Sequence, residues 1–157
     1  MSLIKLKTVI KADAKTCFDV ARSIDVHQES LKSFEEIAVG GKVSGLMELG
    51  EWVNWEVKRF GFVQHLKFKI TEFDSPYYFV DEMLNGDLKF FKHEHLFSEK
   101  NGETVMVDIF SYAARYMFID QIFNFLFLKR YLKNRLIRRN LFVKEKAENL
   151  ALQVIGF

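Results

Sequence analysis

Residues 89–112 read KFFKHEHLFSEKNGETVMVDIFSY and contain the clearest structural signal in the chain. Two strand-like runs, Lys89–Phe97 and Glu103–Tyr112, flank the pair Asn101-Gly102. Asn-Gly is the residue pair that two-residue hairpin turns prefer. The stretch therefore predicts an antiparallel β-hairpin.

The register of this hairpin follows from its turn. A two-residue turn pairs Lys100 with Glu103, which gives every other residue a fixed partner. Three pairs then share one face: His95 with Asp108, Phe97 with Met106, and His93 with Phe110. The opposite face of the second strand carries a more apolar set: Val105, Val107 and Ile109. We follow the turn and expect the histidine face to line the interior.

Further strand-like segments precede the hairpin at regular spacing: Glu51–Phe60, Phe62–Phe73 and Tyr77–Leu84. In the first of them, Val53, Trp55 and Val57 fall on one face, as expected for a half-buried strand. The intervening turn signals are Phe60-Gly61, Asp74-Ser75-Pro76 and Asn85-Gly86. Strands joined by such short turns form an antiparallel meander.

The N-terminal region predicts one more strand and two short helices. Residues Leu3–Ile10 alternate like a strand, and Asp13 is a suitable N-cap for a helix that follows. A second short helix is expected at about Asp25–Lys32, before a glycine-punctuated stretch, Gly40–Gly50.

The C-terminal region changes to helical spacing. From about Phe118 to Leu152 the apolar residues recur every three or four positions, with no glycine or proline between them. The segment Met117–Leu128 is apolar nearly all round, so we expect burial on more than one side. The order of elements predicts an α+β protein in which one helix covers a curved sheet incompletely and leaves room for a cavity.

Composition bounds the class of protein. The chain has 157 residues, 49% hydrophobic and 28% charged, and we expect a single domain over residues 1–157. The net charge of +2 does not demand a polyanionic partner, so we expect no nucleic acid. Cys17 alone cannot form an intramolecular disulfide, and no apolar run is long enough to cross a bilayer. We expect a cytoplasmic protein.

Several short motifs resemble one branch of the START-like superfamily, also called SRPBCC or polyketide cyclase/lipid transport, which includes the major birch pollen allergen. These motifs are Gly41–Leu46, Gly50–Trp55, Pro76–Glu82, His93–Phe97 and Thr104–Asp108. The resemblance covers nearly the whole chain. It implies a helix-grip fold: a curved seven-stranded antiparallel sheet wrapped around a long C-terminal helix, with two short helices after strand one. It also implies an internal cavity for lipids, sterols, polyketides or similar apolar compounds.

The cluster of His93, His95 and Asp108 has three interpretations. The favoured one is a hydrogen-bonded polar pair of His95 and Asp108 inside an apolar pocket. The second is a general acid–base pair, since a carboxylate orients a histidine and raises its pKa. The third is a metal triad of two histidines and one carboxylate. We expect no metal, no cofactor and no catalytic residue; if the protein is an enzyme, His95, Asp108 and His93 are its catalytic residues.

We predict that the ligand contacts side chains on the inner face of the sheet and on the first turns of the long helix. The predicted set is Val53, Trp55, Leu66, Phe68, Phe91, His93, His95, Phe97, Met106, Asp108, Phe110, Tyr112, Ile122, Phe125 and Leu126. Aromatic side chains dominate it, in line with the 17 phenylalanines of the chain.

Three functional hypotheses follow. The leading one is a non-catalytic protein that binds, transports or senses a small hydrophobic ligand. The second is a cyclase, hydratase or hydrolase that acts on an apolar substrate. The third is an interaction module that contacts a partner or transiently a membrane surface through basic residues of the long helix, which we expect on its solvated outer face: Lys129, Arg130, Lys133, Arg135, Arg138, Arg139, Lys144 and Lys146.

Overall fold

A computed structural model describes residues 1–59, 61–86, 88–114 and 121–156, without the side chains of residues 59, 114 and 121–125. The strands are β1 (Ser2–Ile10), β2 (Glu36–Gly41), β3 (Trp52–Arg59), β4 (Phe62–Asp74), β5 (Tyr78–Asn85), β6 (Leu88–Lys100) and β7 (Glu103–Ala114). The helices are α1 (Ala14–Ala21), α2 (Ile24–Ser30) and α3 (Gln121–Ile155), with a short 3-10 turn at Lys32–Phe34.

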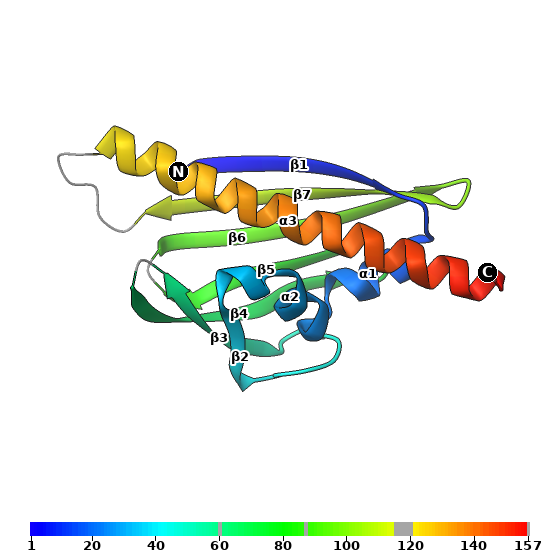
Figure 1. Cartoon of the computed structure of the whole chain (residues 1–157), viewed down its shortest axis with the longest axis horizontal. Helices are drawn as coiled ribbons and strands as arrows, with labels where there is room; N and C mark the ends of the chain where they lie inside the picture. Colours follow the sequence, from blue (N-terminus) through cyan, green and yellow to red (C-terminus); the bar gives the residue numbers. More distant parts are fainter. Residues whose placement is uncertain (60, 87, 115–120, 157) are drawn as a thin grey trace.

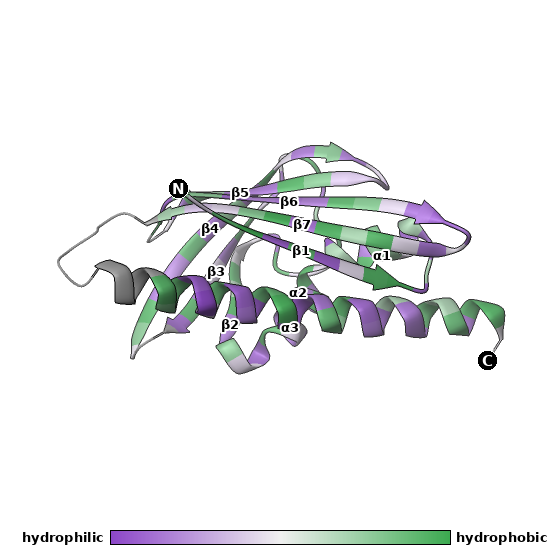
Figure 2. Ribbon diagram, turned by 90° about the horizontal axis from the view of Figure 1, so that it is seen from above, coloured by the Kyte–Doolittle hydropathy of each residue, from purple (hydrophilic) through white to green (hydrophobic). Residues whose placement is uncertain are grey.

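The strands form one seven-stranded antiparallel sheet in the order β1-β7-β6-β5-β4-β3-β2 (Figure 1). Helix α3 runs along one face of this sheet, and the view from above shows it set apart from the strands (Figure 2). Helix α1 contacts β6, β7 and α3, and α2 contacts β2 and α3. The two short helices therefore close part of the space between the sheet and the long helix.

The hairpin of β6 and β7 has the predicted register. Lys100 pairs with Glu103, and Asn101 and Gly102 both have positive φ, 54° and 74°. Positive φ at both central residues is what a type I′ turn requires. His95 therefore lies opposite Asp108, as predicted.

The inner face of this hairpin is also the predicted one. Met106, Asp108 and Phe110 are at most 2% exposed, whereas Val105, Val107 and Ile109 are only partly buried. The geometry of the turn, rather than the hydrophobicity of the last strand, determined which face points inward.

Strand β2 is the element that the sequence pattern did not locate. Its apolar residues Ile37 and Val39 point outward and are 52% and 46% exposed, while the charged Glu36 is 3% exposed. The pairing of β2 with β3 also shifts between Ala38 and Gly40. An inward-facing carboxylate and an irregular register reverse the pattern by which a strand is recognised.

The short helices begin at polar caps. Asp13 accepts a hydrogen bond from the backbone N–H of Thr16 at 2.9 Å, as predicted for the N-cap of α1. Ser23 caps α2, which therefore starts at Ile24 and ends at Ser30, slightly before the predicted range.

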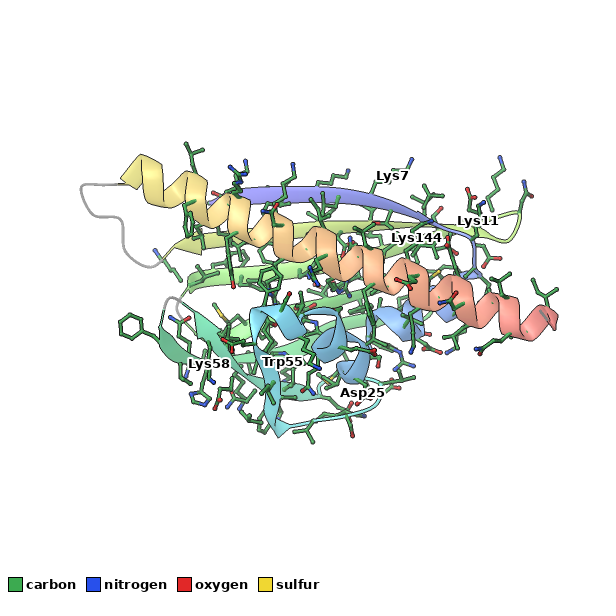
Figure 3. The ribbon with its side chains drawn as sticks, viewed as in Figure 1. Lys7, Lys11, Asp25, Trp55, Lys58 and Lys144 are labelled. Carbon is green, nitrogen blue, oxygen red and sulfur yellow. The ribbon has the colours of Figure 1, made fainter. Side chains whose placement is uncertain are left out.

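Helix α3 packs through one stripe of its surface: Leu132, Leu136, Val143 and Ala147 are at most 6% exposed. Its C-terminal half is also bonded to the end of β1. Lys144 donates to the carbonyl of Val9 at 2.6 Å, and the backbone N–H of Lys11 donates to Glu148 at 2.9 Å (Figure 3).

We expected residues 117–128 to be buried on more than one side of the helix, and this prediction is wrong for Leu126 and Phe127. Leu126 and Phe127 are 58% and 50% exposed. Residues 115–120 lie outside the described ranges. Within those ranges, no helix is both long enough and apolar enough to cross a membrane.

Candidate functional site

A cavity of about 80 Å³ lies between the middle strands of the sheet and the three helices. The apolar part of its wall includes Val53, Trp55, Phe68, Ile70, Phe79, Phe91, Met47, Ile24 and Leu136. Figure 3 marks Trp55 on β3, in the region that α2 covers, and His27 of α2 stacks on its ring at 4.4 Å between centroids. The polar part of the wall includes Asp81, His93, His95, Arg135 and Arg139. Arg22, Ser23, His27 and Lys69 also line the cavity, so about half of its wall residues are polar. A wall that combines apolar side chains with polar groups that orient the ligand is typical of small-molecule sites.

A second, smaller cavity of about 30 Å³ lies next to the first. Its wall includes Leu66, Met83 and Leu132, and both cavities contact Phe68 and Phe91. The rings of Phe68 and Phe91 touch edge to face, with centroids 4.8 Å apart. Together with Arg135, which also lines both cavities, these two side chains form the part of the wall that the cavities share.

The polar end of the first cavity is a cluster of two histidines and two aspartates. His93 and His95 project from the same face of β6 because they are two residues apart. Asp81 of β5 pairs with His93, and Asp108 of β7 pairs with His95. The two imidazoles, with ring centroids 3.7 Å apart, thus lie between two carboxylates.

Each histidine makes one hydrogen bond to a carboxylate. His93 Nε2 donates to Asp108 Oδ1 at 2.7 Å, and His95 Nε2 donates to Asp81 Oδ2 at 2.8 Å. A carboxylate can only accept, so each of these nitrogens must carry the proton. The other two nitrogens also face carboxylates without bonding to them: His93 Nδ1 lies 3.8 Å from Asp81, and His95 Nδ1 lies 3.1 Å from Asp108.

Asp108 is completely buried and is held from the helix side as well. Asn140 donates to its Oδ2 at 2.6 Å, and Arg139 donates to its Oδ1 at 3.3 Å. Arg139 also donates to the carbonyl of Ala21 at 2.8 Å and is only 5% exposed. These bonds fix the carboxylate, and the carboxylate in turn fixes the orientation of His93.

Burial and these contacts displace the pKa values of the cluster. Burial alone would raise the pKa of Asp108, but the hydrogen bond from His93 and the charge of Arg139 hold it well below its usual range. Burial and the neighbouring His95 lower the pKa of His93 to about 4, although both carboxylates oppose this change. Asp108 is therefore ionised and His93 neutral near pH 7.

A second buried ionic group lies where α3 meets β2. Glu36 accepts hydrogen bonds from both Nε and Nη2 of Arg135, the latter at 2.5 Å, and lies 3.1 Å from His27 Nε2. Burial tends to raise the pKa of Glu36, but Arg135 and His27 outweigh it and lower the value to about 2.

Comparisons with known proteins agree with this architecture. No protein-family model and no curated protein sequence matches the chain. Among solved structures, the protein TTHA0849 from Thermus thermophilus matches with a TM-score of 0.75 and 12% identity, over 96% of this chain and 99% of the other. The Zhui aromatase/cyclase from Streptomyces sp. R1128 matches with a TM-score of 0.71 and 12% identity, over 94% and 93%. The ginseng major latex-like protein 151 from Panax ginseng gives 0.57 and 14%, over 96% and 97%.

The chain has the helix-grip fold. The matches extend over the sheet, the two short helices and the long helix, so the fold expected from the sequence is confirmed. At 12–14% identity the likeness is one of architecture, and the chemistry of the site depends on this chain's own residues.

The helix-grip fold brings six of the predicted residues to the wall of the first cavity: Val53, Trp55, Phe68, Phe91, His93 and His95. Leu66 lines the second cavity. Four others are packed into the core without lining either cavity: Phe97, Met106, Phe110 and Tyr112. Asp108 lies behind the histidines and contacts the cavity only through them.

The structure does not show the predicted cavity-lining residues of the first turns of α3 in the walls of the two cavities. Ile122 and Phe125 belong to the helix, but their side chains lie outside the described residues. Leu126 is 58% exposed and lines neither cavity. Within the described part of α3, the cavity wall comes instead from Tyr131, Leu132, Arg135, Leu136 and Arg139.

Sequence reasoning missed Asp81, Glu36, Arg135 and Arg139 as members of buried ionic groups. The expectation that Arg135 and Arg139 lie on a solvated outer face is wrong, because both bond to buried carboxylates. The sequence does contain an indication that Arg139 points inward. It lies three residues after Leu136 and four before Val143, so helical spacing places it on the same buried face.

Proposed function

We propose that this protein binds a small, mainly apolar molecule that carries one polar group, in the cavity between the sheet and the helices. One observation carries the proposal: apolar side chains of the cavity wall lead to a polar cluster of the buried His93 and His95 and the partly buried Asp81. Burial of apolar ligand surface would supply the affinity, at roughly 25 cal/mol per Å² before association costs. The polar cluster would fix the orientation of the ligand.

The size of the cavity restricts the ligand. A volume of about 80 Å³ is more than one water molecule needs and less than the engineered cavity of about 150 Å³ that admits benzene. A ligand with an aromatic ring therefore needs extra room. We infer that it gains this room where Phe68 and Phe91 line both cavities, because rotation of either ring would join them.

The polar group of the ligand is a hydrogen-bond donor in this proposal. Asp81 has 22% of its side chain exposed, and its carboxylate can accept further bonds. Among the described residues no hydrogen-bond donor faces Nδ1 of His93, so this nitrogen can accept as well. A hydroxyl at the end of an apolar body suits this group of acceptors.

Binding of 2-naphthol tests the proposal, because this probe has an apolar body and a single hydroxyl. We expect saturable quenching of Trp55 emission, and binding of naphthalene weaker by about tenfold, or about 1.4 kcal/mol, because it lacks the hydroxyl. Val53→Phe, which fills the cavity, should weaken 2-naphthol binding, whereas Val63→Phe on the exposed side of β4 should not. The absence of saturable binding, together with no copurified compound in native mass spectrometry, would contradict the proposal.

An acid–base enzyme is the second candidate, and the bond from His93 to Asp108 favours it. That bond holds the proton on Nε2 and leaves Nδ1 toward the cavity as a base. On this hypothesis His93→Gln should abolish hydrolysis of an apolar ester such as p-nitrophenyl butyrate and weaken 2-naphthol binding by at most about tenfold, the part assigned to the hydroxyl. Equal hydrolysis by both proteins would exclude His93 as the base.

A further inference from the structure

The histidine cluster brings imidazole nitrogens and carboxylate oxygens close together. Four imidazole nitrogens face the carboxylates of Asp81 and Asp108, at 2.7, 2.8, 3.1 and 3.8 Å. Two of these nitrogens, Nε2 of His93 and Nε2 of His95, make the hydrogen bonds to the carboxylates, and the two Nδ1 atoms lie near a carboxylate oxygen without a hydrogen bond to it. His95 Nδ1 is one of the buried side-chain atoms in the described ranges that make no hydrogen bond. Imidazole nitrogens and carboxylate oxygens gathered in this way are the atoms that transition-metal ions bind.

Asp81, His93 and His95 place possible metal-ligand atoms close to one another. One ligand atom from each of Asp81, His93 and His95 lies within 4.8 Å of the other two, and the nitrogens nearest to Asp81 Oδ2 are His95 Nε2 and His93 Nδ1. Asp81, His93 and His95 also form part of the wall of the first cavity. We propose that these three residues bind a divalent first-row transition-metal ion such as Zn²⁺, Fe²⁺ or Co²⁺, at the polar end of the cavity.

The distances suit such an ion. Bonds of about 2.0–2.2 Å from metal to imidazole nitrogen or carboxylate oxygen place neighbouring ligand atoms about 3.0–3.5 Å apart. Asp81 Oδ2 lies 2.8 Å from His95 Nε2 and 3.8 Å from His93 Nδ1, on either side of that range. Side-chain adjustments of less than about 1 Å would therefore bring both of these distances into the range.

Metal binding would also allow Nδ1 of His95 to form a hydrogen bond with Asp108. With Nε2 of His95 on the metal, its proton moves to Nδ1, which lies 3.1 Å from Asp108. His93 keeps its Nε2 proton and its 2.7 Å bond to the same carboxylate. Asp108 then orients both histidine ligands, as carboxylates around metal sites commonly do, and Arg139 and Asn140 hold Asp108.

The charges of the surroundings favour a cation as well. Two carboxylates, Asp81 and Asp108, face the buried histidines, and the guanidinium of Arg139 offsets one of them. The positive charge of Arg135 is already paired with Glu36. A divalent ion would thus lie beside two carboxylates, in a cavity whose wall also contains Lys69 and Arg22, and three protein ligands would leave positions open toward the cavity.

Titration of the chelator-treated, metal-free protein with Co²⁺ and with Zn²⁺ tests the inference. We expect one equivalent of Co²⁺ to produce d–d absorption bands, and Zn²⁺ to bind in the same stoichiometry by calorimetry. Asp81→Asn and His93→Ala should remove the bands. Asp108→Asn should weaken binding by about 10- to 100-fold, because it only orients the ligands. His65→Ala is the matched control, since His65 is an exposed histidine 3.4 Å from the carboxylate of Glu56.

The wild-type protein provides a test that does not depend on the folding of variants. One equivalent of Zn²⁺ should shift the imidazole ¹⁵N resonances of His93 and His95 and leave those of His27 and His65 in place. Unchanged resonances of His93 and His95 would overturn the inference, as would metal binding that persists in Asp81→Asn but disappears in His65→Ala. The inference goes beyond the proposed function, and 2-naphthol binding by the metal-free protein distinguishes the failure of one from the failure of the other.

Discussion

Replacing Glu36 with glutamine removes the carboxylate that joins β2 to α3 through Arg135. Glu36 is 3% exposed, and its pKa in the folded protein is about 2, against an ordinary value of 4.5. The difference of about 2.5 pH units corresponds to roughly 3 kcal/mol of stability from the ionised form. Because the folded pKa is the lower one, this stability is fully present above about pH 4.5 and is lost as the pH falls toward 2.

Urea unfolding of the wild type and of Glu36→Gln, at intervals between pH 7 and pH 3, measures this contribution. At pH 7 we expect the variant to be less stable by about 3–5 kcal/mol, because Arg135 keeps a buried charge without its partner. The difference between the two proteins should shrink as the pH falls below about 4.5, since Glu36 then binds a proton in the unfolded wild type while it is still ionised in the folded protein. Taking the difference removes the acid sensitivity that both proteins share through Asp81 and Asp108.

Glu72→Gln is the control for this experiment. Glu72 pairs with Lys92 at 3.2 Å, but 52% of its side chain is exposed, so the loss should be at most about 1 kcal/mol. A stability difference for Glu36→Gln that stays constant from pH 7 to pH 3 would contradict this prediction. It would mean that Glu36 acts through packing and not through its ionised form.

Three other substitutions test the packing of the fold. Phe68→Ala should join the two cavities, raise 2-naphthol affinity and lower the free energy of unfolding by about 2–4 kcal/mol in urea titrations. Leu136→Ala in the buried stripe of α3 should cost about 2–5 kcal/mol by the same measurement, whereas Leu141→Ala, at a position 61% exposed, should cost much less. Asp13→Ala should lower stability by about 1 kcal/mol, seen as a lower Tm, because the N–H of Thr16 loses its cap; an unchanged Tm would show that the cap contributes nothing.

The sequence predicted the last hairpin well because its turn is local and obeys a strong rule. Asn101-Gly102 sets the pairing of β6 with β7, and the pairing of His95 with Asp108 follows directly. The same rule fails one hairpin earlier. A two-residue turn at Asn85-Gly86 would place Asp81 opposite Phe90, on the other face from His93, whereas Asp81 lies opposite His93. Asp81 therefore could not be assigned to the site from its turn.

The buried ionic groups escaped prediction for a different reason. A charged residue on a helix or strand is most often solvated, and a pattern-based assignment places it outside. Glu36, Arg135 and Arg139 point inward because each finds a partner of opposite charge on an element distant in the chain. Only the three-dimensional arrangement supplies those partners, so one sequence alone does not reveal them.

Arg135 and Arg139 are four residues apart on α3 and bond to strands near opposite edges of the sheet. Arg135 bonds to Glu36 on the edge strand β2, and Arg139 bonds to Asp108 on β7, five strands away in the sheet order. One turn of α3 thus connects β2 to β7 through these two ion pairs. Movement of β2 away from β7 would leave a buried guanidinium without its partner, so on the proposed function a ligand would gain room by rotation of aromatic side chains.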